Sequence, residues 1–238
     1  MKLSFENDRV LAVMAHPDDA ELLCAGTLAR AKADGAAVAI CVMCRGDKGV
    51  GSTTGTVDLG EIRHEEATAA AQILGAELYW QGASDGQLFD THDERLKLVA
   101  TFRRFRPTLV IAHSPADYHP DHRAASAIAE AATWFAASRG HVTPGLDPLE
   151  APPSLWWADT INMSGFDPGF FVDVSAYVDW KAQMLACHQS QVRRGVDPDL
   201  APLMSLMTHQ MEARGRQSQV VASECFTIDA SFKRSRAW

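Results

Sequence analysis

The sequence predicts an α/β fold in which helices cover a mostly parallel sheet. Short apolar runs recur along the first half of the chain, and each is followed by a polar segment and then by a helix-like stretch. Runs that are apolar throughout are typical of strands buried on both faces. Because helical stretches alternate with these runs, we expect right-handed crossovers between parallel strands. The length of 238 residues suits a single domain, residues 1–238, with elaborations.

The first half of the chain supplies the regular alternation. Leucine and alanine mark its helices, which glycine or proline ends. The long glycine-rich stretch from residue 45 to 60 is expected to be a loop. In chain order, the predicted strands (β) and helices (α) are β Val10–Ala15, α Glu21–Ala33, β Val38–Met43, α Glu61–Leu74, β Glu77–Trp80, α Glu94–Phe105, β Leu109–Ala112 and α Ala124–Ala137.

The second half is less regular. Residues 139–154 hold four prolines and two glycines, so they are interpreted as a loop insertion. Residues 155–238 are expected to complete the domain with late strands and helices. The predicted elements there are strands over Leu155–Asn162 and Gly169–Val174, a helix over Ala176–Ser190 and a closing strand over Val220–Ile228.

Composition excludes several classes of protein. The net charge of −8 argues against a nucleic-acid binder, which normally shows a basic patch. No apolar run is long enough to cross a membrane, and the first residues do not resemble a signal peptide. Five cysteines, an odd number scattered along the chain, favour a reducing, cytoplasmic location.

Two polar motifs carry the chemistry. His16-Pro17-Asp18-Asp19 follows the first predicted strand, and His119-Pro120-Asp121-His122 follows the fourth. Ligands of open parallel sheets bind outside the carboxyl ends of the strands. Although about a hundred residues separate the motifs in sequence, we expect both at this same edge of the sheet.

The residue types indicate a catalytic metal. Imidazole nitrogen and carboxylate oxygen are usual ligands of a zinc ion with three protein ligands and one open position. His16 and Asp19, three residues apart at the start of a helix, can converge on one ion, and His122 is a natural third ligand. Asp18 and His119 then remain for acid–base work, with Asp121 beside them. Iron or cobalt would also suit these ligands.

These motifs resemble those of the LmbE/PIG-L-like zinc-dependent N-deacetylases. Further resemblance lies in Gly26-Thr27-Leu28, Arg63 with Glu66, Asp85-Gly86-Gln87-Leu88, and His188-Gln189-Ser190-Gln191. The last motif is similar to that of the N-acetylglucosaminyl-malate deacetylases of bacillithiol synthesis. The resemblance implies a Rossmann-like three-layer sandwich with the metal site at the C-terminal strand edge. It also implies a homo-oligomer, commonly a trimer or hexamer.

The resemblance also implies roles for single residues. His16, Asp19 and His122 would bind the metal, and Asp18 would be the general base for the attacking water. His119 would stabilise the oxyanion and protonate the leaving amine, with Asp121 orienting it. Arg63 and Asp85 would hold sugar hydroxyls, and His188 would line the site. One departure is Ala20, which precedes Glu21 where many members have Glu directly after the two aspartates, so the role of Glu21 is open.

The sequence therefore predicts a cytoplasmic, zinc-dependent deacetylase of an N-acetylglucosamine-type sugar or its conjugate. One alternative is a deacylase or amidase acting on a non-sugar N-acyl metabolite. Another is a metal-free hydrolase using Ser84, because Gly82-Ala83-Ser84-Asp85-Gly86 fits the G-x-S-x-G pattern. A third is a non-catalytic sugar-binding protein. No nucleic-acid or membrane partner is expected.

Overall fold

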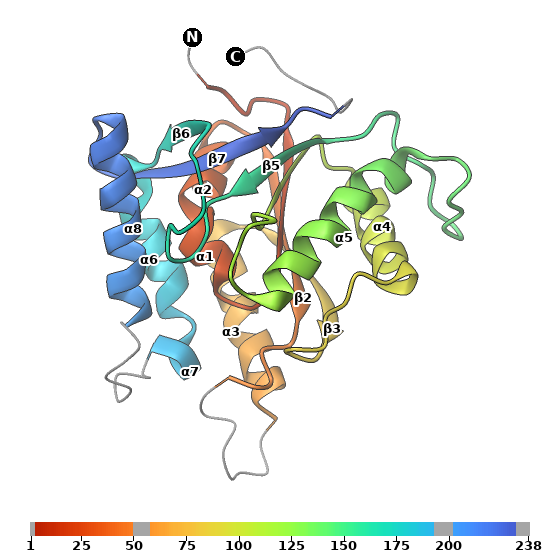
Figure 1. The fold of residues 1–238 in the computed structure, drawn as a ribbon, viewed down its shortest axis with the longest axis horizontal. Helices are drawn as coiled ribbons and strands as arrows, with labels where there is room; N and C mark the ends of the chain where they lie inside the picture. The colour runs from red at the N-terminus through yellow and green to blue at the C-terminus, as the bar shows by residue number, and fades with distance from the viewer. Residues whose placement is uncertain (1–2, 50–57, 193–201, 232–238) are drawn as a thin grey trace.

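The computed structural model describes residues 3–49, 58–192 and 202–231. Seven strands form one sheet in the order β3-β2-β1-β4-β5-β7-β6 (Figure 1). The strands are β1 (Arg9–Met14), β2 (Ala37–Cys44), β3 (Glu77–Ala83), β4 (Leu109–Ala112), β5 (Ser154–Ala158), β6 (Phe170–Asp173) and β7 (Ser223–Asp229). The helices are α1 (Asp19–Leu23), α2 (Ala25–Ala33), α3 (Leu59–Leu74), α4 (His92–Phe105), α5 (Pro120–Ala137), α6 (Val178–Ala186), α7 (Gln189–Val192) and α8 (Leu203–Ser218).

The pairing of the strands confirms the predicted α/β fold with a mostly parallel sheet. Strands β1 to β5 pair in parallel, and β7 alone runs antiparallel to its neighbours β5 and β6. From β1 the chain moves outward through β2 to β3, then returns to β4 on the other side of β1. The direction of winding therefore reverses between β1 and β4, which is where such sheets bind their ligands.

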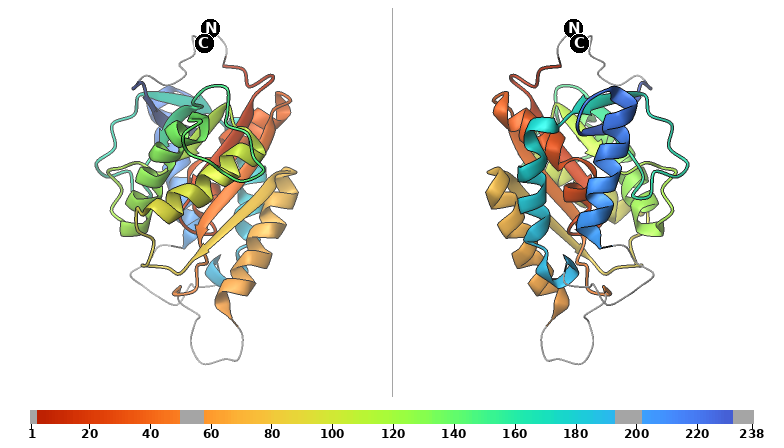
Figure 2. Two further views of the ribbon diagram at one scale, coloured as in Figure 1. Left: turned by 90° about the vertical axis from the view of Figure 1, so that its right-hand side faces the viewer. Right: turned by 90° about the vertical axis from the view of Figure 1, so that its left-hand side faces the viewer.

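Alternating side chains of the central strand divide the core into two layers. Val10, Ala12 and Met14 pack into one hydrophobic cluster with α1, α2, α3, α6 and α8, while Leu11 and Val13 pack into another with α4 and α5. This is the period of two that a strand imposes on its side chains. Figures 1 and 2 show the sheet between α6 and α8 on one side and α4 and α5 on the other.

The helix predicted over Glu21–Ala33 is divided at Cys24. The buried carboxylate of Glu224, on β7, accepts the backbone N–H groups of Gly26 and Thr27 at 2.9 and 2.7 Å. It thereby caps a new helix, α2, and Lys181 neutralises it at 2.6 Å. The partner that divides the helix lies about two hundred residues away in sequence, so local patterning could not predict the division.

The later elements depart most from the sequence prediction. The strand expected over Leu155–Asn162 ends at Ala158, and the helix expected over Ala176–Ser190 is divided into a short 3₁₀ turn, α6 and α7. Helix α8 was not predicted. The helix predicted from Ala124 begins earlier, at Pro120, so the second polar motif forms its first turn. The predicted loop over residues 45–60 lies partly outside the described residues. Among those described, no helix is both long and apolar enough to cross a membrane.

Candidate active site

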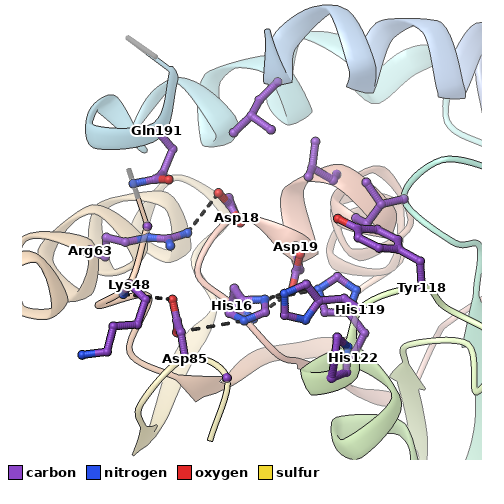
Figure 3. A pocket seen from close by; sticks show the side chains of 16 residues that line it. His16, Asp18, Asp19, Lys48, Arg63, Asp85, Tyr118, His119, His122 and Gln191 are labelled. Carbon is purple, nitrogen blue, oxygen red and sulfur yellow. Dashed lines mark hydrogen bonds and ion pairs between the residues drawn. The ribbon is translucent and has the colours of Figure 1, made fainter. Parts of the chain in front are cut away.

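A pocket of about 570 Å³ opens at the carboxyl ends of β1 and β4. The first polar motif follows β1 after one residue and the second follows β4 after six residues, and both line this pocket as expected (Figure 3). Its floor is formed by His16, Asp18, Asp19, His119 and His122. The volume lies within the range of about 300 to 1,000 Å³ that small-molecule sites usually occupy.

A strained turn presents the first motif. Asp18 has a positive φ of 110°, a conformation that residues other than glycine rarely adopt. Asp19 begins α1, and its Oδ2 accepts the backbone N–H of His16 at 2.7 Å. The turn therefore directs the side chains of Asp18 and Asp19 into the pocket from adjacent positions. Backbone strain of this kind is commonly found at functional sites.

The second motif is presented by the N-terminus of α5. His119 is the N-cap residue, its Nδ1 accepts the N–H of Asp121 at 3.2 Å, and Pro120 occupies the first turn. One turn of helix then places His122 beside His119, with ring centroids 4.7 Å apart. Because Nδ1 of His119 accepts a hydrogen bond, the proton of its neutral ring is assigned to Nε2.

The three predicted metal ligands converge. His16 Nδ1 lies 3.2 Å from His122 Nε2, and each of these nitrogens lies 3.4 Å from Asp19 Oδ2. Ligand atoms held about 2.0 to 2.1 Å from a tetrahedral zinc lie about 3.3 to 3.4 Å from one another. The spacing of the three atoms therefore fits a metal ion bound by three protein ligands.

Two further carboxylates orient the two histidines of this set. Asp121 Oδ2 lies 3.1 Å from Nε2 of His16, and Asp117 Oδ1 lies 3.0 Å from Nδ1 of His122. Each carboxylate favours a proton on the nitrogen it faces, which leaves the other nitrogen free to bind a metal. Asp121 was expected to orient His119, but it approaches that ring only to 4.0 Å. Its nearer imidazole is His16.

Electrostatics at the site favour a bound cation. Burial disfavours a charged His16, but hydrogen bonds to Asp121 and Asp19 outweigh it and raise the pKa of His16 to about 10. Burial also opposes the charge on Asp19, yet the neighbouring His122 and His113 hold its pKa well below the usual value. A divalent ion would satisfy the same carboxylates without a proton on Nδ1 of His16. The donor set and its charge therefore both fit a metal.

His113, Asp117 and Tyr118 are site residues that the sequence prediction missed. The fully buried ring of His113 stacks on His122 at 4.0 Å, and its Nε2 accepts the N–H of Ala15 at 2.9 Å. Tyr118 lines the pocket with 61% of its surface exposed. His113 is the first residue after β4, so applying the strand-end rule to every polar residue there would have found it.

Asp18 in the floor of the pocket forms an ion pair with Arg63. Arg63 is buried, and its guanidinium donates to Asp18 Oδ2 at 3.0 Å and to the carbonyl of Pro17. Desolvation nevertheless raises the pKa of Asp18, with Arg63 opposing the shift. A raised carboxyl pKa suits a base working near neutral pH. Arg63 was predicted to hold sugar hydroxyls, and its guanidinium is already engaged with Asp18.

A glycine makes room for this arginine. Gly46 has a positive φ of 72°, and a Cβ at that position would lie 2.5 Å from the Arg63 side chain. The Gly46 N–H in turn donates to Asp85 Oδ1 at 2.8 Å. The carboxylate of Asp47 accepts the Asp85 N–H at 2.9 Å and the hydroxyl of Ser84 at 2.8 Å. These reciprocal contacts join the loop after β2 to the loop after β3 and hold Asp85 at the pocket wall.

The contacts of Ser84 do not resemble those of an activated nucleophile. Its hydroxyl donates to the Asp47 carboxylate. It follows β3 in a turn that leads to further loop residues, and α4 does not begin until His92. A nucleophile elbow passes directly from strand to helix. The local structure therefore does not support the Ser84 alternative.

His188 lies behind the pocket wall. Its ring is fully buried, and its Nε2 lies 3.4 Å from the carboxylate of the buried Glu21. Burial disfavours charge on the ring, but Glu21 outweighs it and raises the pKa of His188. The predicted helix is interrupted at Cys187 and His188, which turns this ring inward. Gln191 instead is the residue of that segment that lines the pocket.

Comparison with known proteins places this site in context. The family model described as PIG-L, GlcNAc-PI de-N-acetylase, matches residues 11–133, which include both polar motifs. Diacetylchitobiose deacetylase from Thermococcus kodakarensis is 30% identical over 198 residues, covering 77% of this chain and 70% of the relative.

Two further proteins that are similar to this chain carry different names. A conserved protein of Thermus thermophilus, known from a crystal structure, is 34% identical with a TM-score of 0.79, covering 97% of this chain and 100% of that one. The 4-oxalmesaconate hydratase of Pseudomonas putida is 28% identical over 190 residues, covering 76% of this chain and 73% of the hydratase. Similarity at this level therefore extends to more than one reaction.

Proposed function

This chain belongs to the PIG-L family of de-N-acetylases, and from that premise we propose that it is a zinc-dependent hydrolase of N-acetylated amino sugars. The observation that carries the proposal is the triangle of His16, Asp19 and His122 ligand atoms, with 3.2 to 3.4 Å sides. Asp18 and His119 flank this triangle in the same pocket. A metal, a base and a hydrogen-bond donor around one pocket are the parts that amide hydrolysis needs.

The metal would be held by His16 Nδ1, Asp19 Oδ2 and His122 Nε2. When bound, a divalent cation in such a site polarises the substrate carbonyl and lowers the pKa of water to about 7. Histidine and carboxylate ligands accept zinc, iron or cobalt, and zinc is our proposal for the native metal.

Asp18 carries out both catalytic proton transfers, and His119 stabilises the developing charge. Asp18, whose carboxyl pKa is raised, takes the proton of the attacking water. The Nε2–H of His119 donates a hydrogen bond to the carbonyl oxygen as negative charge develops there. Burial and the neighbouring His16 and His122 lower the pKa of His119, which keeps this ring neutral near pH 7. Asp18 then returns its proton to the departing amine nitrogen, and the second proton of the water passes from the new carboxylic acid to the amine, so that the products are a carboxylate and an ammonium group.

This assignment changes one part of the expected mechanism. His119 was predicted both to stabilise the oxyanion and to protonate the leaving amine. Its Nδ1 accepts the Asp121 N–H, so the neutral ring carries a single proton, on Nε2. A neutral ring that donated this proton completely would become an imidazolate. We therefore propose His119 as hydrogen-bond donor only.

A hydratase is the second candidate, since a relative of similar identity carries that name. Addition of water to a double bond would use the same base and metal. A carboxylated substrate, however, calls for cationic groups in the pocket wall. Apart from its histidines, the described part of the lining has two cationic side chains, Lys48 and Arg63. Arg63 is already paired with Asp18, which favours the deacetylase.

The test is amine release from N-acetylglucosamine and diacetylchitobiose by purified protein, before and after chelation and after zinc is added back. We expect release that chelation abolishes and zinc restores. Asp18→Asn should lower the rate by about 100-fold or more while zinc content is retained. Asp173→Asn, which changes an aspartate at the end of β6, is the matched control. Turnover of 4-oxalmesaconate without amine release would instead identify a hydratase.

We also propose a cytoplasmic homo-oligomer. All five cysteines are free thiols, which supports a reducing compartment. Analytical ultracentrifugation would test the trimer or hexamer that the family resemblance implies.

A further inference from the structure

The pocket has two chemically different sides. Figure 3 shows Lys48, Arg63, Asp85 and Gln191 on one side of His16 and Asp19, and Tyr118 on the other. Three residues with branched aliphatic side chains also line the pocket: Leu22, Ile161 and Leu203. None of these three side chains has a role in the proposed steps of amide hydrolysis, so their presence in the pocket needs a separate explanation.

The aliphatic residues lie near the metal ligands and Tyr118. Leu22 is on α1, three residues after Asp19, so one helical turn places it on the same face as that ligand. The backbone N–H of Ile161 lies 3.4 Å from Asp117, the residue before Tyr118. Leu203 begins α8, which packs against α1 and against α7, the helix that carries Gln191. We call Leu22, Ile161 and Leu203 the apolar wall.

The apolar wall is continuous with the protein core. Leu22 and Ile161 belong to the hydrophobic cluster beneath α1, α2, α6 and α8, and the half-buried Leu203 packs against it. The core therefore opens into the pocket at this point. An apolar surface inside a reaction pocket gains stability when an apolar part of a ligand covers it.

The polar side of the pocket suits a sugar. Lys48 has 63% of its side chain exposed, and Asp85 and Gln191 supply a carboxylate and an amide. Charged and amide groups of this kind bind hydroxyls by hydrogen bonds. The two substituents of an amide carbonyl point away from each other. If the sugar nitrogen faces the polar side, the acyl group faces the apolar wall.

From this division we infer that the apolar wall binds the acyl group, and that the enzyme also hydrolyses N-acyl amino sugars longer than acetyl, such as propionyl and butyryl. The inference depends on the proposed hydrolase function and extends its substrate class. Water adds its oxygen to the acyl carbon, the C–N bond breaks, and both water protons go to the amine nitrogen. The products are an aliphatic carboxylate and the amino sugar with a protonated amine, and the reaction needs no further reactant.

The experiment compares kcat/KM for N-acetyl-, N-propionyl- and N-butyrylglucosamine with zinc-loaded enzyme. Each methylene buried on the apolar wall is expected to raise kcat/KM by up to about fourfold, from about 0.8 kcal/mol per methylene. We expect the butyryl substrate to be hydrolysed at least as efficiently as the acetyl substrate. A decrease of tenfold or more from acetyl to butyryl would overturn the inference.

Variants locate the effect. Leu203→Asn keeps the approximate size of the side chain but makes it polar, and should lower the butyryl-to-acetyl ratio of kcat/KM by about fivefold. Leu206→Asn is the matched control, because it is on the same helix and outside the pocket lining, and its ratio should not change. Leu203→Ala replaces Leu203→Asn if the latter does not fold.

The outcomes separate this inference from the proposed function. Release from the acetyl substrate alone leaves the hydrolase standing and refutes the acyl-binding role of the apolar wall. An equal loss for all three substrates in Leu203→Asn would show that the wall contacts the sugar, which also refutes the inference. No amine from any substrate, with zinc bound, would refute the hydrolase itself.

Discussion

Replacing Asp117 by asparagine tests whether this carboxylate prepares His122 to bind metal. Asp117 Oδ1 lies 3.0 Å from Nδ1 of His122 and accepts the N–H of His119 at 3.0 Å. Burial opposes the charge on Asp117, but the neighbouring His122 and the N–H of His119 outweigh it and lower the pKa of Asp117, so the group is ionised at neutral pH. Asparagine preserves the shape and one acceptor but removes the charge. The proton on Nδ1 of His122 is then less favoured, and so is the lone pair on Nε2.

The magnitude follows from the position of the group. Carboxylates that orient a metal-binding histidine typically change metal affinity by about 10- to 100-fold. This corresponds to about 1.4 to 2.8 kcal/mol of binding free energy. At a fixed free-zinc concentration far above either Kd, the same free energy is lost from the zinc-induced stabilisation of the fold.

Two measurements determine how much Asp117 contributes to zinc binding. Competition with a chromophoric chelator gives the zinc Kd, and thermal unfolding with and without zinc gives the stabilisation. Asp173→Asn, remote from the site, should leave both unchanged. An Asp117→Asn protein that folds normally and binds zinc within twofold of the original affinity would refute the reasoning, because the carboxylate would then contribute nothing to His122.

Three further changes test other contacts. Gly46→Ala places a Cβ 2.5 Å from the Arg63 side chain and should displace the guanidinium that donates a hydrogen bond to Asp18. We expect kcat/KM to fall at least about tenfold without loss of zinc. The control Gly140→Ala, at an exposed glycine, should leave activity unchanged, and unchanged activity in Gly46→Ala would contradict the reasoning. His119→Asn and His119→Ala should both lower kcat by about 100-fold or more. Only the alanine variant should also lose about 1 kcal/mol of stability, because asparagine retains an N-cap acceptor. Equal urea midpoints for the asparagine and alanine variants would refute the capping role of His119. Burial opposes ionisation of Asp47, but hydrogen bonds led by the Asp85 N–H lower its pKa to about 2. The ionised Asp47 therefore stabilises the fold fully above its unfolded pKa of 3.8, and this stabilisation is lost as the pH falls towards 2. Asp47→Asn should make the urea midpoint depend less on pH across that interval. An unchanged pH dependence would show that the loop contacts of Asp47 are not formed.

The sequence predicted those parts of the molecule that depend on neighbours in the chain. The strand over Leu109–Ala112 and the helix ending at Gly75 agree with the structure because a continuous apolar run and a C-terminal glycine determine them locally. The convergence of His16, Asp19 and His122 was also predictable. The rule that ligands bind at the carboxyl ends of parallel strands brings the ends of β1 and β4 together without any knowledge of side-chain packing.

Contacts between distant parts of the chain account for what was missed. Cys24 interrupts a helix because Glu224 caps the next one, and His188 turns inward because Glu21 is buried beside it. Asp121 faces His16 more closely than its sequence neighbour His119, since the two motifs meet across the crevice between β1 and β4. No local pattern in the sequence records these partners.

The same distinction separates the chemistry of the site from its selectivity. The proposed metal ligands, the proposed base Asp18 and His119 come from the ends of β1 and β4, and a base beside a metal can activate water for hydrolysis or for hydration. The preference for one substrate over another must therefore come from the side chains of the pocket walls. Leu203 belongs to α8, a late element that the sequence did not predict, and Ile161 belongs to the segment after β5. A relative could therefore keep the same ligands and base while replacing aliphatic residues by cationic ones, and the preferred substrate would change from a neutral amide to a carboxylated alkene. Exchanging Leu203 for lysine tests this directly: the motif residues predict retained zinc binding, and the wall predicts a loss of butyrylamide hydrolysis relative to acetamide hydrolysis. Loss of zinc in that variant would contradict the separation of catalytic floor from selective wall.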